Sequence, residues 1–453
     1  MHSYVTYPAY KTSDGNWIGD IPVGWGVKRL KFLLMEPLKY GANESAELSD
    51  TDLPRYIRIT DVKDDGSLRA ETFRSLPEDI AKPYLLDEGD ILLARSGATV
   101  GKTFIYRKPW GRAAFAGYLI RARTNRNILN ADFAYYFLQS SAYWQWLNSV
   151  AIQATIQNVS AEKYASLFIP LPDLSRQRII VRFLDFKTAQ IDALIAKKQT
   201  LLEKLAEKRT ALISHAVTKG LDPSVSMRDS DVAWLGEVPA HWKVIPIKFS
   251  LAMPITDGPH STPQFYDDGI PFLSAESVKN DRLDFSKMRG YISEDDHAFF
   301  SKKYKPKFGD VYMVKSGATT GAVARVETHD EFNIWSPLAV LRPHLDKSVT
   351  DYLFYVLKSR PFFYSVELSW SYGTQQNIGM GVISNIRMPL PPLKEQEQIC
   401  RYLEPLLQKI EDQKSKVDSV IDRLQEYRSS LITNAVTGKI DVRDFPHPAS
   451  VSS

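Results

Sequence analysis

The sequence contains a single cysteine, Cys400, among 453 residues. One cysteine excludes a disulfide within the chain and any zinc site built from cysteines. No run of about 18 apolar residues occurs, so the sequence predicts no membrane-spanning helix. The N-terminus lacks the basic-then-apolar order of a signal peptide. We therefore expect a cytoplasmic protein that does not enter a membrane.

Strong charge of one sign is also missing. The chain has 57 Lys and Arg against 53 Asp and Glu, a formal net charge of +4. Such a mild excess points only weakly to an anionic partner. Hydrophobic residues make up 44% and charged residues 24% of the chain, as in ordinary globular proteins. The length is enough for two or three domains.

Motifs for catalysis and cofactor binding are absent as well. The segment Gly97–Thr103 resembles a phosphate-binding P-loop, but it has one residue too few before its Gly-Lys-Thr, and the repeated copy Gly317–Val323 has no lysine. There is no glycine-rich fingerprint for a dinucleotide or S-adenosylmethionine, and the scattered histidines form no HExxH motif. The sequence therefore predicts a protein that is not an enzyme and that itself binds no cofactor or metal.

The sequence does contain an internal repeat with a period of about 217 to 220 residues. The repeated pairs of segments are Trp17–Trp25 and Trp234–Trp242, Gly89–Gly101 and Gly309–Gly321, and Ala154–Val159 and Gly373–Ile378. Each copy begins with short β-branched and aromatic runs typical of strands and continues with a helical pattern. We expect two similar α+β globular domains, each followed by one long helix.

Each predicted long helix carries an apolar seam. Its candidate positions are Leu184, Ile191, Leu205 and Leu212 in the first copy, and Leu403, Ile410, Val417, Leu424 and Leu431 in the second. A period of about 3.5 over four heptads indicates a coiled coil, and each helix would span roughly 65 Å. The simplest partner of each helix is the other copy. Antiparallel pairing would give a pseudo-twofold molecule with one globular domain at either end.

One alternative to the coiled coil remains open, in which these helices are ordinary core helices of one large domain. In addition, Pro405 falls inside the second helix, where proline removes a hydrogen bond. The helix would then either kink at this point or begin with a separate short segment.

The repeat predicts a domain layout. The expected segments are a first domain over residues 1–171, a helix over 172–218, a linker over 219–231, a second domain over 232–390, a helix over 391–437 and a loose tail over 438–453.

Two polar clusters recur in both copies and are candidates for DNA contact. The first follows a predicted buried strand and contains Arg95, Ser96, Thr99 and Lys102, with Lys315, Ser316, Thr319 and Thr320 as its second copy. The other contains Gln153, Gln157 and Asn158, with Gln375, Gln376 and Asn377. Gln and Asn can pair with an adenine edge in the major groove, although such amides can equally bond their own loop. The aromatic runs that precede them, such as Tyr143–Trp146, fit core packing better than base stacking.

Each copy joins its domain to its helix through Pro-Leu-Pro-x-Leu-x-x-Gln, at Pro170–Gln177 and Pro389–Gln396. With the Trp-x-Gly-x-x-Pro-x-x-Trp openings and the Ser-Gly-Ala-Thr-x-Gly turns, this arrangement resembles the specificity subunit of Type I restriction–modification systems. The resemblance covers essentially the whole chain. Pro405 departs from it, and so does the pair Ser175-Arg176, which stands where the second copy has Lys394-Glu395.

The resemblance implies a non-catalytic reader of double-stranded DNA. Each globular domain would be a target-recognition domain for one half of a bipartite, asymmetric site. The helix pair would set the gap and dock two methyltransferase (M) subunits, which carry S-adenosylmethionine. Restriction (R) subunits, with ATP and Mg, could join. The stretches 64–88 and 279–308, where the copies diverge most, are expected to contribute to sequence readout.

A hypothesis from another class is a coiled-coil interaction scaffold with two protein-binding heads and no DNA target. The salt dependence of binding separates the two hypotheses, because contacts with DNA phosphates weaken steeply as ionic strength rises.

Overall fold

The computed structural model of the chain describes residues 4–63, 66–151, 158–369 and 377–445. Its contacts divide the chain into a first unit, Met1–Lys198 with Ser419–Ser453, and a second unit, Gln199–Asp418. Each unit holds one globular domain and part of each long helix. The predicted layout, in which the helices were separate segments, therefore differs from the compact units that the chain forms.

The first unit is built on a four-stranded antiparallel sheet of order β4–β9–β6–β7, formed by Lys39–Tyr40, Leu119–Ala122, Ile91–Ala94 and Thr103–Ile105. All residues of β6 are buried, as its apolar run predicts. The other strands pair as β1 (Tyr10–Thr12) with β2 (Asp20–Pro22), β3 (Gly26–Arg29) with β10 (Phe168–Leu171), and β5 (Arg55–Ile57) with β8 (Ala113–Phe115). The short helices are α1 (Glu78–Ala81), α2 (Ala131–Phe137), α3 (Ser141–Ala151) and α4 (Ala161–Ala165).

The second unit repeats this plan on a six-stranded sheet of order β14–β22–β19–β20–β17–β16, formed by Thr256–Asp257, Leu338–Leu341, Val311–Val314, Val323–Arg325, Arg282–Leu283 and Val278–Lys279. A three-stranded sheet has the order β18–β15–β21, formed by Gly290–Ile292, Ile270–Leu273 and Asn333–Ile334. The remaining strands are β11 (Met227–Asp229), β12 (Glu237–Pro239), β13 (Lys243–Pro246) and β23 (Arg387–Leu390). The short helices are α6 (Glu294–Ser301), α7 (Thr350–Leu357), α8 (Arg360–Leu368) and α9 (Met380–Asn385). The mixed composition of both units confirms the predicted α+β class.

A buried ion pair stands at the same place in both sheets, just before the central strand. Asp90 is 1% exposed and accepts hydrogen bonds from Nε and Nη2 of Arg123 at 2.8 and 2.7 Å. Asp310, also 1% exposed, accepts them from the same atoms of Arg342 at 2.6 and 2.8 Å. Two-pronged pairing of this kind satisfies a carboxylate that would otherwise be costly to bury. The repeat thus preserves the frame of the sheet.

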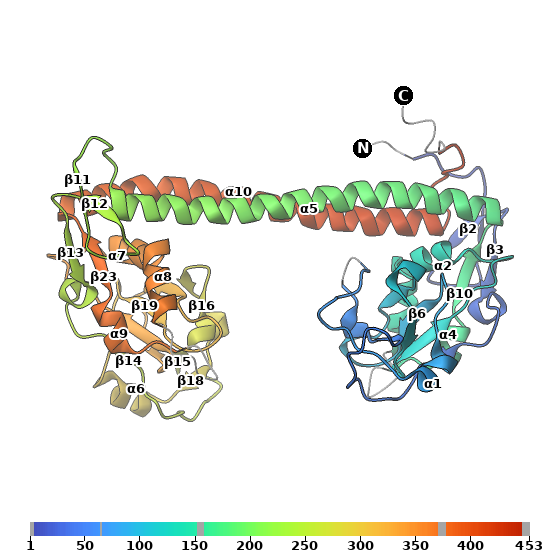
Figure 1. Cartoon of the computed structure of the whole chain (residues 1–453), viewed down its shortest axis with the longest axis horizontal. Coiled ribbons are helices and arrows are strands. Elements are labelled where there is room, and N and C mark those ends of the chain that lie inside the picture. Colours follow the sequence, from blue (N-terminus) through green and yellow to red (C-terminus); the bar gives the residue numbers. More distant parts are fainter. Residues whose placement is uncertain (1–3, 64–65, 152–157, 370–376, 446–453) are drawn as a thin grey trace. The chain divides into compact units, whose positions relative to one another are not determined.

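The long helices α5 (Leu174–Lys219) and α10 (Leu393–Val436) can be followed in Figure 1. In the first unit, the start of α5 packs against the end of α10, through Leu184 and Leu431 among others. In the second unit, the end of α5 packs against the start of α10, through Ile213 and Leu403. The start of each long helix thus packs against the end of the other, which is the predicted antiparallel arrangement. No helix in the described ranges is long and apolar enough to cross a membrane.

Pro405 lies within α10, which continues through it as one helix. Of the two alternatives for this proline, the separate short segment is therefore wrong. Pro405 is exposed, so the carbonyl group that loses its intrahelical partner can be solvated.

Two glutamines connect the long helices to the domains that precede them. The side chain of Gln177 accepts from the backbone N–H of Asn130 at 2.7 Å and donates to the carbonyls of Ile128 and Pro172 at 3.0 and 2.8 Å. Gln396 makes the same three bonds, with Val349 at 2.9 Å and with Lys347 and Pro391 at 2.9 Å each. Both glutamines are completely buried. The last residue of the repeated Pro-Leu-Pro motif is therefore the joint between domain and helix.

Two predicted loose segments are ordered parts of the fold. In the predicted tail, Ile440 and Val442 are only 8% and 5% exposed, and the ring of Phe445 lies 5.2 Å from that of Phe183. The expectation of a loose tail was wrong for its described part, because these apolar side chains complete the core of the first unit. The predicted linker 219–231 contains β11, which pairs with β12.

Candidate nucleic-acid interface

The first candidate cluster lies on a tight turn after a buried strand, as predicted. The chain leaves β6 and forms a 3₁₀ turn over Gly97–Thr99. Gly97 and Gly101 have φ of +78° and +82°, a left-handed conformation that glycine adopts without steric cost. The N–H of Gly101 returns to the carbonyl of Ala94 at 3.0 Å. The turn thus reverses direction directly at the end of the strand.

The two polar clusters, separate in sequence, meet at this turn. Ser96 forms an antiparallel bridge with Asn158. The N–H of Val159 donates to the carbonyl of Arg95 at 2.8 Å, and Nε of Arg95 lies 3.5 Å from Oδ1 of Asn158. Backbone pairing therefore places the guanidinium, the hydroxyl and the amide beside one another. Gln153 and Gln157 lie outside the described residues.

Tyrosines that sequence reasoning missed complete this tip. The guanidinium carbon of Arg95 lies 4.7 Å from the ring centroid of Tyr40, at a distance suited to a cation–π contact. The hydroxyl of Tyr40 accepts from the N–H of Ala161 at 3.0 Å. The N–H of Arg95 donates to the carbonyl of Tyr118 at 3.0 Å. Both tyrosines are 39% exposed. We call Tyr40, Arg95, Ser96, Tyr118 and Asn158 the first tip.

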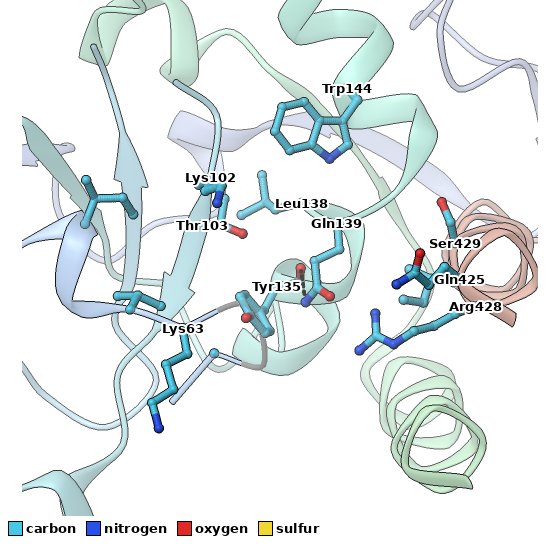
Figure 2. Close-up of a pocket in the computed structure, with 14 residues that line it drawn as sticks. Lys63, Lys102, Thr103, Tyr135, Leu138, Gln139, Trp144, Gln425, Arg428 and Ser429 are labelled. Carbon is cyan, nitrogen blue, oxygen red and sulfur yellow. Dashed lines mark hydrogen bonds between the residues drawn. The ribbon is translucent and has the colours of Figure 1, made fainter. Parts of the chain in front are cut away.

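The two other candidates on this turn have different surroundings. Thr99 is partly buried. Lys102 is exposed and lines a cavity of about 350 Å³ in the first unit, shown in Figure 2. Lys63 and Arg428 bring further positive charge to this cavity, whose walls include the ring of Trp144. Trp144 is 38% exposed, whereas its neighbours Tyr143 and Trp146 are buried in the core.

The second unit forms the same turn after β19. Gly317 and Gly321 have φ of +103° and +94°. Ser316 bridges Asn377, and the N–H of Ile378 donates to the carbonyl of Lys315 at 2.8 Å. The predicted turn and amide residues are therefore brought together a second time. Gln375 and Gln376 lie outside the described residues.

The cation of the second turn is held by a buried carboxylate. Lys315 has a side chain only 12% exposed, and its Nζ lies 3.4 Å from Oδ2 of Asp257, which is 1% exposed. Lys303 donates to the other oxygen of Asp257, and Nε2 of His260 lies 3.1 Å from Oδ2. Burial raises the pKa of Asp257, but the hydrogen bond from Lys303 and the neighbouring positive charges outweigh it, so the pKa lies below its ordinary value of 3.8. We call Asp257, His260, Lys303, Lys315, Ser316 and Asn377 the second tip.

The threonines of the second turn divide into one exposed and one buried residue. Thr319 is exposed. Thr320 is 7% exposed, and its hydroxyl donates to the carbonyl of Gly317 at 2.7 Å. The side chain of Thr320 is therefore turned into the fold in this conformation and stabilises the turn, and its contact with DNA stays a prediction.

Tyr40 and Asp257 occupy equivalent positions, since Tyr40 pairs with Ile120 in the first sheet and Asp257 with Ala339 in the second. The repeat does not reveal them, because the two residue types are unlike. The glycine that follows each was the available signal. A Cβ on Gly41 or Gly258 would lie 2.2 Å from the carbonyl oxygen of Phe115 or 1.8 Å from that of Ile334. Each glycine thus lets the strand end pass another backbone closely.

The nine candidate seam residues of the long helices all lose exposure to solvent. Buried are Leu184, Ile191, Leu205, Leu403, Ile410 and Leu431, and partly buried are Leu212, Val417 and Leu424. Apolar residues on other faces remain exposed, including Phe186, Leu194, Val420 and Tyr427 in the first unit, at 40%, 41%, 36% and 42%. Among the described residues, no group of His, Cys, Asp and Glu gathers closely enough to hold a metal ion.

These features define a tandem-repeat protein in which two similar domains present one polar tip each. The family model of the type I restriction modification DNA specificity domain matches residues 36–204 and 255–418. The two matches cover most of the chain and include both tips. The chain therefore belongs to this family, which confirms the resemblance seen in the sequence.

Individual relatives agree with the family. The type I restriction enzyme EcoKI specificity subunit of Escherichia coli K12 is 22% identical over 436 residues, covering 93% of this chain and 90% of the relative. The MjaVIII specificity subunit of Methanocaldococcus jannaschii is 23% identical over 374 residues, covering 80% and 82%. One chain in a structural study of complex assembly and conformational transition of the type I R-M system matches 93% of this chain and 99% of its own length, with a TM-score of 0.68 and 17% identity. This last likeness supports the fold.

Proposed function

We propose that this chain is the DNA-reading subunit of a type I restriction–modification complex and that each tip reads one half of a bipartite site. One observation carries the proposal. The two tips share a backbone scaffold yet differ in the residue beside the cation, Tyr40 at Arg95 and Asp257 at Lys315. A common scaffold with different chemistry suits a site whose two halves have different sequences.

The first tip has the groups for direct readout. An arginine that pairs with O6 and N7 of guanine typically contributes about 1–3 kcal/mol of discrimination. Stacking on Tyr40 and the proximity of Asn158 restrict the orientations of Arg95 before DNA arrives, which reduces the entropy lost on binding. In the second tip, Lys315 is only 12% exposed and lies against Asp257, a carboxylate that it shares with Lys303. Readout there rests more on Ser316, Thr319 and Asn377.

The paired helices are proposed to set the gap between the half-sites and to dock two methyltransferase subunits. The exposed Phe186, Leu194, Val420 and Tyr427 support this docking, because a helix pair in water normally covers its large apolar side chains. The methyltransferase subunits would carry S-adenosylmethionine, and this chain would be non-catalytic. Restriction subunits with ATP and Mg would join the same complex.

The decisive experiment is co-expression of the full chain with its methyltransferase subunit in a host that lacks adenine methylation, followed by sequencing of modified bases. We expect one split motif with a constant gap. A soluble complex that methylates nothing would reject the DNA-reading function and favour an interaction scaffold. Methylation at an undivided motif would retain DNA reading and reject the spacing role of the helices.

A further inference from the structure

The short hairpin between β16 and β17 in the second unit has an unusual tip. Asn280 and Asp281 have φ of +49° and +68°, the left-handed region that Asn and Asp tolerate better than most residues. The strands beside the tip pair Lys279 with Arg282. The backbone thus turns sharply enough to project the carboxylate of Asp281 away from its own sheet.

That carboxylate joins three parts of the second unit. Arg209 of α5 donates to one oxygen of Asp281, and Lys358, directly after α7, donates to the other. The side chains of Arg209, Asp281 and Lys358 are only 21%, 22% and 24% exposed. Charge-assisted bonds shielded from water are stronger than ion pairs at an open surface. The hairpin is therefore held to the long helix and to the helical layer of its domain.

In the first unit, the residues that match the hairpin tip in the repeat, 64–65, lie outside the described residues, and the described partner positions differ. Arg428 of α10 corresponds to Arg209 in the repeat, as the segments Glu426–Ile432 and Glu207–Ile213 show. Arg428 turns instead to Asp192 of α5, with Nε–Oδ1 at 2.9 Å and Nη2–Oδ2 at 3.3 Å. Gln139 stands where the second unit has Lys358.

The described partner positions of the first unit border a cavity. Arg428 and Gln139 face the cavity of about 350 Å³ shown in Figure 2. Among the described residues, Arg428 and Gln139 therefore form no ion cluster like that of Arg209 and Lys358.

We propose that Asp281 is a positioning residue for DNA recognition, fixing the reading domain of the second unit to α5 and so restricting the gap and the second half-site that the protein accepts. This inference rests on the proposed function. A free hairpin would let the domain adopt more orientations relative to the helix. The affinity for correct targets would then fall, whereas the affinity for targets with a wrong gap would fall only slightly.

The experiment uses the full chain in complex with its methyltransferase subunit and a target taken from the sequenced methylation motif. Asp281→Asn keeps a residue that tolerates positive φ but removes the charge. Arg209→Gln removes the partner without touching the hairpin, and Arg209→Lys retains a cation. Asp192→Asn is the matched control in the first unit. Methylation rates are measured on the correct target, on targets with the gap changed by one base pair, and on targets with one base changed in either half-site.

We expect Asp281→Asn and Arg209→Gln each to lower discrimination against the wrong gap by about fivefold, a size expected for one partly buried charge pair. The double variant should be no worse than Asp281→Asn alone, because Asp281→Asn already removes the contact with Arg209. Discrimination in the second half-site should fall, and that in the first should not change. Arg209→Lys should retain most of the wild-type ratio between methylation rates on the correct target and on the wrong-gap targets. Asp192→Asn should retain this ratio in full.

The ratio of methylation rates on two targets does not change when a fraction of the protein unfolds, so a change in this ratio reports positioning. Hydrogen exchange in the second unit measures any destabilisation separately. Folded Asp281→Asn and Arg209→Gln complexes with wild-type ratios would overturn the inference. So would equal losses in both half-sites. A wild-type complex without a split motif would instead overturn the proposed function.

Discussion

Arg95 and Lys315 stand at the same point of two similar domains, yet one lies over an exposed ring and the other beside a buried carboxylate. The frame beneath them hardly differs. Asp90 and Asp310 pair with equivalent arginines, and Gln177 and Gln396 make equivalent hydrogen bonds. The repeat preserves the ion pairs and glutamines that build the domain, whereas the residue that contacts the cation differs between the two copies.

The largest effects are expected from breaking the shared frame. Asp90→Ala and Asp310→Ala should each cost about 3 kcal/mol, because each removes a buried carboxylate that binds a partly buried arginine and a backbone N–H group. Asp310→Ala should cost more, since Asp310 also accepts from the hydroxyl of Tyr304 at 2.5 Å. Hydrogen exchange of peptides from each unit measures both losses. Glu203→Ala, at an exposed helix position, is the control and should cost little stability. If Asp310→Ala cost no more than this control, the role of the ion pair in the shared frame would be contradicted.

The next effect concerns the tips. Arg95→Ala should weaken binding to the correct target by about 2 kcal/mol, because it removes a cation oriented for base contact. Lys315→Ala should change affinity much less, since the side chain of Lys315 is only 12% exposed and lies against Asp257. Titrations of the methyltransferase complex at fixed salt measure both. A larger loss for Lys315→Ala would reverse the proposed difference between the tips.

A smaller effect is expected with acid. The folded-state pKa of Asp257 lies below its ordinary value of 3.8. Its contribution to stability is therefore complete above about pH 3.8 and is lost as the pH falls through the lowered pKa. Asp257→Asn should lower the stability of the second unit at pH 7 and reduce its further loss between pH 4 and pH 2. Unfolding followed by unit-specific hydrogen exchange tests this, and an unchanged acid profile would contradict it.

The smallest effect should come from the ion pair between Arg428 and Asp192, whose side chains are 31% and 51% exposed. Asp192→Asn should cost less than about 0.5 kcal/mol, because surface ion pairs contribute little. Denaturant unfolding of the full chain is the measurement. A loss above about 1 kcal/mol would contradict the treatment of this pair as an ordinary surface ion pair.

Periodicity and repetition predicted most of the frame. The seam of the long helices, the α+β domains and the turn after a buried strand all follow local rules that a sequence displays. The meeting of Ser96 with Asn158 depends on tertiary pairing across some 60 residues, and only the repetition of both clusters hinted at it. Tyr40 and Asp257 were missed because their role comes from the strand next to them.

The mistaken predictions have a common cause. Ile440 and Val442 were assigned to a loose tail because two apolar residues among prolines and serines carry no clear period. Their burial depends on a partner at the other end of the chain, since they join the core that contains Tyr7 and Trp25. The burial of Thr320 is likewise not visible in the sequence, because it depends on the turn in which its hydroxyl bonds the carbonyl of Gly317.

The contribution of the residues near the C-terminal end of the described chain to the first unit has a consequence for synthesis. Leu431, Ile432, Ile440 and Val442 complete a core that otherwise consists of N-terminal residues. The second unit, Gln199–Asp418, is a continuous segment and leaves the ribosome before those residues do. At about 5–20 residues per second, the domain that is made first must wait for residues 431–442 to be made before it can close its core.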